Sequence, residues 1–156
     1  NGVSKSYAMT GWRIGYCGGP ATIVDAMSTI QSQSTSNPSS IAQKAAIVAL
    51  NGDQGCVAEM NKHFKARHDF FNAGLNALPG VRCLEPGGAF YLFPNIEGTG
   101  MDDVAFSGKM LEEAGVSMVP GSFFGDAGKG FVRLCYATSR ENIEEALRRM
   151  RACLVP

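Results

Sequence analysis

NGVSKSYAMTGWRIGY, residues 1–16, is the stretch that decides the fold of this chain. Lys5 lies there among small side chains, and Arg13 follows eight positions later, between a tryptophan and a short β-type run. The glycines on either side of Trp12-Arg13 indicate backbone kept close to a ligand, and a permanently charged guanidinium suits a phosphate dianion. Taken alone, Lys5 fits an ordinary surface lysine, and Arg13 fits either a solvated arginine or a phosphate ligand.

The composition is that of a globular protein: of the 156 residues, 45% are apolar and 18% charged, enough for a sizeable core. Fourteen basic and fourteen acidic side chains cancel, which gives no support to nucleic-acid binding. No apolar run approaches the roughly 18 residues of a membrane helix. Five irregularly spaced cysteines indicate free thiols in a reducing compartment. Two histidines five residues apart, His63 and His68, do not share a helix face, so we expect no metal pair.

Periodicity predicts mainly helices in the first half of the chain. We expect a short strand at 13–17, a helix from Pro20 to about Gln31, and a second helix from the Asn37-Pro38 pair to about Leu50. Four residues of the second helix should face inward: Ile41, Ala45, Val48 and Ala49. A long helix over 56–78, about 30 Å in length, should end at Pro79-Gly80.

The second half alternates between strand and helix patterns. We expect strands at 81–84, 89–93, 116–119 and 131–137 and a helix at 101–114 capped by Asp102. The spacing Thr138-x-x-Glu141 indicates a capping box that starts the last helix. The apolar face of that helix should consist of Ile143, Ala146, Leu147, Met150 and Leu154. The pattern predicts a compact α+β unit over about 60–156, in which Phe90 and Tyr91 pack in the core.

Arg133 interrupts an apolar strand, FVRLCY at 131–136. The two-residue period places Val132, Leu134 and Tyr136 on one face and Arg133 on the other. A charge in such a strand is costly to bury unless it has an anionic partner. A structural salt bridge and a bound anionic ligand both satisfy this requirement.

Several segments resemble the class I, aspartate aminotransferase-like, enzymes that use pyridoxal 5′-phosphate (PLP). They are the Ser4-Lys5 pair, the run AMTGWRIGY at 8–16 with its lysine-to-arginine spacing, and the strand around Arg133, which is similar to the family's Arg-Leu/Ile-Ser-Tyr-Ala sequence. PGGAFY at 86–91 and VPGSFFG at 119–125 follow in the family's order. The resemblance covers the whole chain and is strongest to bacterial-type aspartate aminotransferases.

The resemblance implies a role for each site residue. Lys5 would carry PLP as a Schiff base and move a proton between substrate and cofactor. Arg13 would bind the cofactor phosphate, with Ser4 adding a hydroxyl contact, and Arg133 would grip the substrate α-carboxylate. Gly2 stands where family members commonly have a further phosphate-binding serine. No metal ligand is implied.

The same resemblance implies the C-terminal portion of a longer α/β enzyme of fold type I, with α+β character in this stretch. We expect residues 1–55 to end the large PLP-binding domain, residues 56–80 to form an interdomain helix, and residues 81–156 to form the small antiparallel-sheet domain. In the family, other cofactor contacts lie upstream of the lysine. We therefore expect the chain alone to be inactive.

By this likeness, the enzyme moves an amino group from an amino acid, with aspartate expected, to a 2-oxo acid such as 2-oxoglutarate in ping-pong order. Other interpretations stay open: a β-lyase or other fold-type-I PLP enzyme, an aromatic or arogenate/prephenate aminotransferase, and a non-catalytic dimerisation or regulatory module. The family implies a homodimer; segment 33–37 either approaches the neighbouring subunit's site or is an ordinary loop and helix cap. We expect a cytoplasmic protein, and a location in an organelle also stays open. We expect no nucleic-acid or membrane partner.

Overall fold

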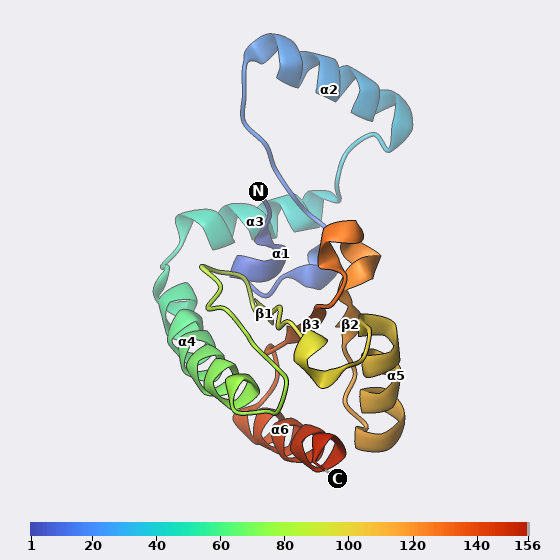
Figure 1. The fold of residues 1–156 in the computed structure, drawn as a ribbon. Helices are drawn as coiled ribbons and strands as arrows, with labels where there is room; N and C mark the ends of the chain where they lie inside the picture. The colour runs from blue at the N-terminus through green and yellow to red at the C-terminus, as the bar shows by residue number, and fades with distance from the viewer. Residues whose placement is uncertain (156) are drawn as a thin grey trace. The chain divides into compact units, whose positions relative to one another are not determined.

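The computed structural model describes residues 1–155, which divide into two compact units, residues 1–60 and residues 61 onward (Figure 1). No helix in the described residues combines the length and the apolar character that a membrane span needs. The helices and strands follow in the order α1 (Val3–Ser6), α2 (Ala21–Ser34), α3 (Ser40–Asn51), α4 (Gly55–Asn76), β1 (Tyr91–Leu92), α5 (Asp103–Ala114), β2 (Val119–Pro120), β3 (Val132–Cys135) and α6 (Arg140–Leu154).

The strand predicted at 13–17 is reduced to one antiparallel bridge between Gly2 and Gly15. Two hydrogen bonds extend this bridge: the Asn1 amino group donates to the Tyr16 carbonyl at 2.8 Å, and the Tyr16 amide donates to the Asn1 carbonyl at 2.9 Å. A strand needs a neighbour along its whole length, and in the described residues only this short terminal segment pairs with it. The predicted strand was therefore wrong at every position except Gly15.

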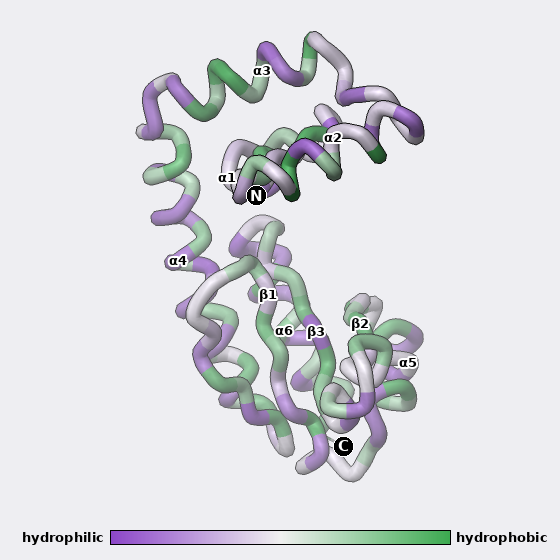
Figure 2. Tube along the Cα trace, turned by 90° about the horizontal axis from the view of Figure 1, so that it is seen from above, coloured by the Kyte–Doolittle hydropathy of each residue, from purple (hydrophilic) through white to green (hydrophobic). Residues whose placement is uncertain are grey.

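Both helices predicted in the first unit are present, but the inward face of the second was partly misassigned. Ala42 and Ala46 are the buried residues of α3, whereas Ile41 and Val48, which were predicted to face inward, are each 72% exposed. The other two residues predicted to face inward are half-buried: Ala45 and Ala49. Periodicity shows that α3 has apolar stripes, but the stripe that packs depends on the neighbouring elements. Figure 2 shows hydrophobic positions repeating along both α2 and α3.

Helix α4 confirms the predicted long helix and continues from the first unit into the second. Its apolar side is buried at Phe71 and Leu75, and Leu78 is buried just beyond its end. Phe64 packs against the same core. The periodicity of the helix therefore predicted the face that packs in the second unit.

The sheet of the second unit has three antiparallel strands in the order β1-β3-β2 (Figure 2). Tyr91 pairs with Cys135 on one side of β3, and Val119 pairs with Arg133 on the other. The strand predicted at 81–84 contributes one bridge, between Arg82 and Asn95. The predicted strand was too long, because in the described residues Arg82 is the only residue of 81–84 that forms a β-bridge.

Helices α4, α5 and α6 contribute, with the sheet, to one apolar core. Asp102 caps α5 as predicted, since its Oδ1 accepts the Ala105 amide at 2.7 Å. The cap of α6 lies one residue later than predicted: Ser139 Oγ accepts the Asn142 amide at 3.2 Å. Thr138 accepts the Asn142 side-chain amide instead, at 2.9 Å. The predicted apolar face of α6 is confirmed, with Ile143 and Met150 buried and the rest packed against the core.

Candidate functional site

The Lys5 segment is a single helical turn, α1, anchored at its start. Val3 is fully buried, while Ser4 is half-buried and Lys5 is exposed. The Tyr7 hydroxyl donates to Gln54 Oε1 at 2.8 Å and ties the end of the turn to the residues that follow α3. The lysine amine is therefore carried on a fixed backbone.

The Arg13 segment lies alongside the chain that leads into α1. The Gly2–Gly15 bridge joins the two segments, and a Cβ on Gly15 would lie 3.2 Å from the Asn1 carbonyl oxygen. Arg13 adopts a left-handed backbone conformation, with φ of 51°, and its Nη1 donates to the Thr10 carbonyl at 3.0 Å. Ala8 is also left-handed, with φ of 54°. Such strained non-glycine residues cluster at functional sites, so the backbone between Lys5 and Arg13 supports the predicted binding loop.

The side chains of this unit fit PLP by their chemistry. An exposed primary amine is the group that can join an aldehyde, and an exposed guanidinium is the group that suits a phosphate dianion. Ser4 adds a hydroxyl one residue before the lysine. The first unit thus holds Lys5, Arg13 and Ser4 together on one short, bridged stretch of chain.

Arg133 belongs to the second unit and lies on β3 with the predicted alternation. Val132, Leu134 and Tyr136 are buried, whereas Arg133 is half-buried on the other face. Its Cζ lies 4.4 Å from the centroid of the Tyr91 ring and 4.7 Å from that of Phe124. In the described part of the chain, no carboxylate pairs with it. The structural salt bridge considered from the sequence is therefore not what holds this arginine.

These two rings are neighbours of Arg133 that sequence reasoning missed. Tyr91 was expected in the core, and the predicted site did not include Phe124. The available signal was register: Tyr91 lies opposite Cys135, two residues along β3 from Arg133, and such diagonal cross-strand neighbours are within reach of aromatic side chains. No periodic pattern identifies Phe124, which lies in a turn.

The turn that carries Phe124 is held by Asp103, a buried carboxylate at the start of α5. The Ser122 amide donates to Asp103 Oδ2 at 2.7 Å. Hydrogen bonds from the Ser122 side chain and amide keep the pKa of Asp103 below its usual range. The turn is also closely packed, because a Cβ on Gly121 would lie 2.1 Å from the Gly128 carbonyl oxygen.

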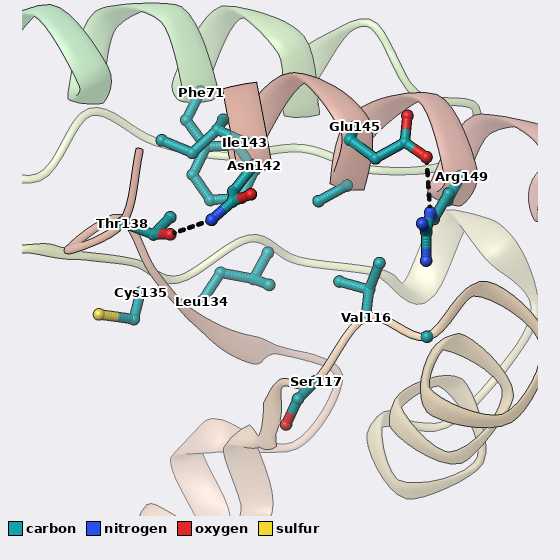
Figure 3. A pocket seen from close by; sticks show the side chains of 12 residues that line it. Phe71, Val116, Ser117, Leu134, Cys135, Thr138, Asn142, Ile143, Glu145 and Arg149 are labelled. Carbon is teal, nitrogen blue, oxygen red and sulfur yellow. Dashed lines mark hydrogen bonds and ion pairs between the residues drawn. The ribbon is translucent and has the colours of Figure 1, made fainter. Parts of the chain in front are cut away.

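A cavity of about 320 Å³ lies beside β3 and α6, and Arg133 is not among its lining residues (Figure 3). Its floor includes Leu134, which alternates with Arg133 along the strand. Four of its polar side chains pair with one another: Asn142 donates to Thr138, and Arg149 Nε donates to Glu145 Oε1 at 2.8 Å. Arg148 and Arg149 together lower the pKa of Glu145 to about 2. The cavity is therefore separate from the predicted carboxylate site.

One cluster of potential metal ligands occurs in the described residues, formed by His68, Asp69 and Glu85. His68 Nδ1 lies 2.8 Å from Asp69 Oδ1, and the Lys65 ammonium lies 2.5 Å from the same oxygen. Lys65 therefore already supplies a cation to this carboxylate. We assign no metal to the cluster.

A family model described as "Aminotransferase class I and II" matches residues 1–150. The aspartate/prephenate aminotransferase of Nitrosomonas europaea is 50% identical to the chain, over 99% of the chain and 41% of that protein. The crystal structure of the aspartate aminotransferase from Rhizobium meliloti superposes with a TM-score of 0.93 at 47% identity, over 99% of this chain and 40% of that one. An aromatic aminotransferase from Pyrococcus horikoshii also gives 0.93, at 43% identity over 97% and 41% of the two chains. The chain spans about two fifths of the length of the curated relatives it matches.

Proposed function

The chain belongs to the aminotransferase class I and II family, and on that premise we propose that it is the part of a PLP-dependent aminotransferase that supplies the cofactor lysine and the substrate-binding arginine. The observation that carries the proposal is the family match over residues 1–150, a range that contains all four predicted site residues. The fold agrees with that family, since solved aminotransferases superpose on nearly the whole chain.

Lys5, Arg13 and Ser4 would hold the cofactor. When bound, PLP supplies an electrophilic aldehyde carbon and an electron-withdrawing ring, which together allow an amino group to be taken up and passed on. The Lys5 amine would hold the group at its aldehyde and, when released, would carry a proton on Nζ. Arg13 would bind the phosphate as a fixed cation, and the Ser4 hydroxyl would donate to a phosphate oxygen.

Arg133 would bind the carboxylate that every amino-acid and 2-oxo-acid substrate carries. Its guanidinium is half-buried, and no acidic residue in the described chain neutralises it. A planar carboxylate can accept two parallel hydrogen bonds from such a fork. Binding to Arg133 would therefore orient the substrate for the groups that act on its α-carbon.

The names of the relatives support a proposal for the substrates. We propose aspartate as amino donor and 2-oxoglutarate as acceptor in a ping-pong reaction, because relatives at 48–50% identity are named aspartate or aspartate/prephenate aminotransferases. The structural neighbour named an aromatic aminotransferase makes aromatic donors the second set to test. A homodimer and a cytoplasmic location are part of the same proposal. The described cysteines are all free, as a reducing compartment requires.

The test uses the protein extended to the length of its relatives and loaded with PLP. We expect aspartate to convert the bound cofactor to its amino form, seen as a change in absorbance, and 2-oxoglutarate to restore it. Lys5→Ala should lower the rate of amino transfer by more than about 100-fold, whereas Lys44→Ala, an exposed lysine of α3 in the same unit, should leave it unchanged.

Full activity of the Lys5→Ala variant would contradict the cofactor assignment. A cofactor spectrum that ignores aspartate but responds to phenylalanine or arogenate would keep the assignment and change the donor. Release of pyruvate without amino transfer would indicate a β-lyase instead. The isolated 156 residues should show no turnover, and steady transamination by them would contradict our expectation that the site needs further chain.

A further inference from the structure

Two aromatic rings flank the Arg133 guanidinium, and they come from the two opposite sides of β3. Tyr91 is on β1, which pairs along one edge of β3, while Phe124 follows β2, which pairs along the other. The Cζ of Arg133 lies 4.4 and 4.7 Å from the two ring centroids, inside the roughly 6 Å range of a cation–π contact. The arginine is therefore held from both sides along the sheet.

Both rings are on backbone that cannot easily move. Tyr91 is fixed by the β1–β3 ladder. Phe124 ends a short turn whose Gly121 amide donates to the Phe131 carbonyl at 2.8 Å and whose Ser122 amide donates to Asp103. The contact that holds Arg133 is thus built from the sheet on one side and from an anchored turn on the other.

The geometry of a guanidinium makes this arrangement useful for binding a carboxylate. Its five N–H donors lie in the plane of the group and point outward from its edges, whereas aromatic rings attract the cation through their π-faces. Rings can therefore hold the cation and leave its N–H donors available. A carboxylate partner would instead occupy those donors with hydrogen bonds. Holding the long side chain in one place also reduces the entropy that is lost when a ligand binds.

We propose that Tyr91 and Phe124 are positioning residues that hold the Arg133 guanidinium with its donors directed at the substrate α-carboxylate. This inference rests on the proposed role of Arg133 in substrate binding. It assigns a purpose other than core packing to one aromatic residue in each of two segments, Tyr91 in 86–91 and Phe124 in 119–125. The two rings act on the substrate only through Arg133.

Phe123 provides a matched control for Phe124. It is the neighbouring residue in the same turn, has the same ring and is 72% exposed, and in residues 1–155 its ring makes no cation–π contact with Arg133. In the PLP-loaded protein of full length, Phe124→Leu and Tyr91→Leu should each raise KM for the amino-acid donor about 3- to 30-fold, the range of a cation–π contact. The value of kcat should change by less than about twofold, because the lost contact acts on binding. Phe123→Leu should leave both unchanged.

A second measurement separates positioning from packing. Replacing Phe124 with phenylalanines that carry one, two or three ring fluorines keeps the shape close to native and progressively weakens the π-face. We expect KM to rise stepwise along this series while the midpoint of thermal unfolding stays constant. Phe124→Trp should retain a KM within about threefold of the native value, since indole is the best cation–π partner.

The outcomes distinguish this inference from the proposed function beneath it. Arg133→Lys should raise KM more than either ring variant does, because it removes the bidentate fork. If Arg133→Lys raises KM but the fluorinated series stays flat, or Phe123→Leu matches Phe124→Leu, then the positioning role is wrong and the role of Arg133 stands. If Arg133→Lys leaves KM unchanged, the proposed carboxylate site itself is wrong.

Discussion

The two units of the chain differ sharply in how they bury apolar side chains. In residues 1–60 only Val3, Ala42 and Ala46 are buried, and α2 buries none of its fourteen residues. From residue 61 onward, sixteen buried residues form one core cluster. A fold is stable when apolar burial exceeds the cost of ordering the chain. The comparison therefore indicates that the second unit can stabilise itself, whereas the first carries its lysine and arginine on elements with little core of their own.

Separating the units should have the largest effect. Residues 55–156, which keep α4 whole, should unfold cooperatively with a free energy of about 5–10 kcal/mol, as expected for a domain of this size. Residues 1–54 should show no cooperative transition, because they lack a comparable buried core. Circular dichroism during urea unfolding measures both. Cooperative unfolding of residues 1–54 would contradict the inferred difference in stability between the two units.

Truncating one isoleucine in each unit sharpens the same difference. Ile96 is fully buried in the second unit, and Ile30 on α2 is 71% exposed. Ile96→Ala should lower the free energy of unfolding by about 2–5 kcal/mol, through lost burial and the cavity left behind. Ile30→Ala should change it by less than about 0.5 kcal/mol, as measured by urea unfolding of the chain. A comparable loss at Ile30 would mean that the exposed face of α2 is packed in solution.

Adding a methyl group at a glycine tests packing density in the two units. Gly121→Ala places a Cβ 2.1 Å from a backbone oxygen of Gly128, so we expect a loss of about 1–3 kcal/mol from overpacking. Gly11 in the first unit has no atom within 4 Å of the added Cβ, and Gly11→Ala should be close to neutral. Thermal unfolding of both variants measures the two changes in stability. If Gly121→Ala is as stable as the native chain, the turn that carries Phe124 can shift to accommodate the added methyl group.

The smallest expected effect concerns the pH dependence contributed by Asp103. Its pKa is lowered in the folded protein by hydrogen bonds from Ser122, so its carboxylate contributes stability above its unfolded pKa, about 3.9. That contribution is lost as pH falls through the lower, folded pKa. Asp103→Asn should therefore be less stable than the native chain at pH 7, and the difference should shrink as pH is lowered below about 4. A difference that stays constant between pH 7 and pH 3 would contradict this linkage.

The elements that sequence analysis located well share one property: their apolar periodicity is long and their partner lies within the second unit. The apolar side of α4, the buried face of α6 and the alternation around Arg133 are of this kind. The elements that it misjudged depend on a neighbour. Within residues 1–155, segment 13–17 forms a single β-bridge, at Gly15, and α3 packs through Ala42 and Ala46 rather than through its larger side chains.

The roles proposed for Lys5, Arg13 and Arg133 come from the sequence, because the motifs around these residues resemble those of the aminotransferase family and that resemblance implies the roles. The alternation that brings Arg133 to the open face of β3 is likewise a local property, set by the two-residue period of a strand. The tertiary structure decided what surrounds the arginine. Tyr91 and Phe124 lie 42 and 9 residues before it in the sequence, and only strand pairing and the anchored turn bring their rings within 5 Å of its guanidinium. Such contacts depend on register and loop closure, which no local pattern of residues encodes.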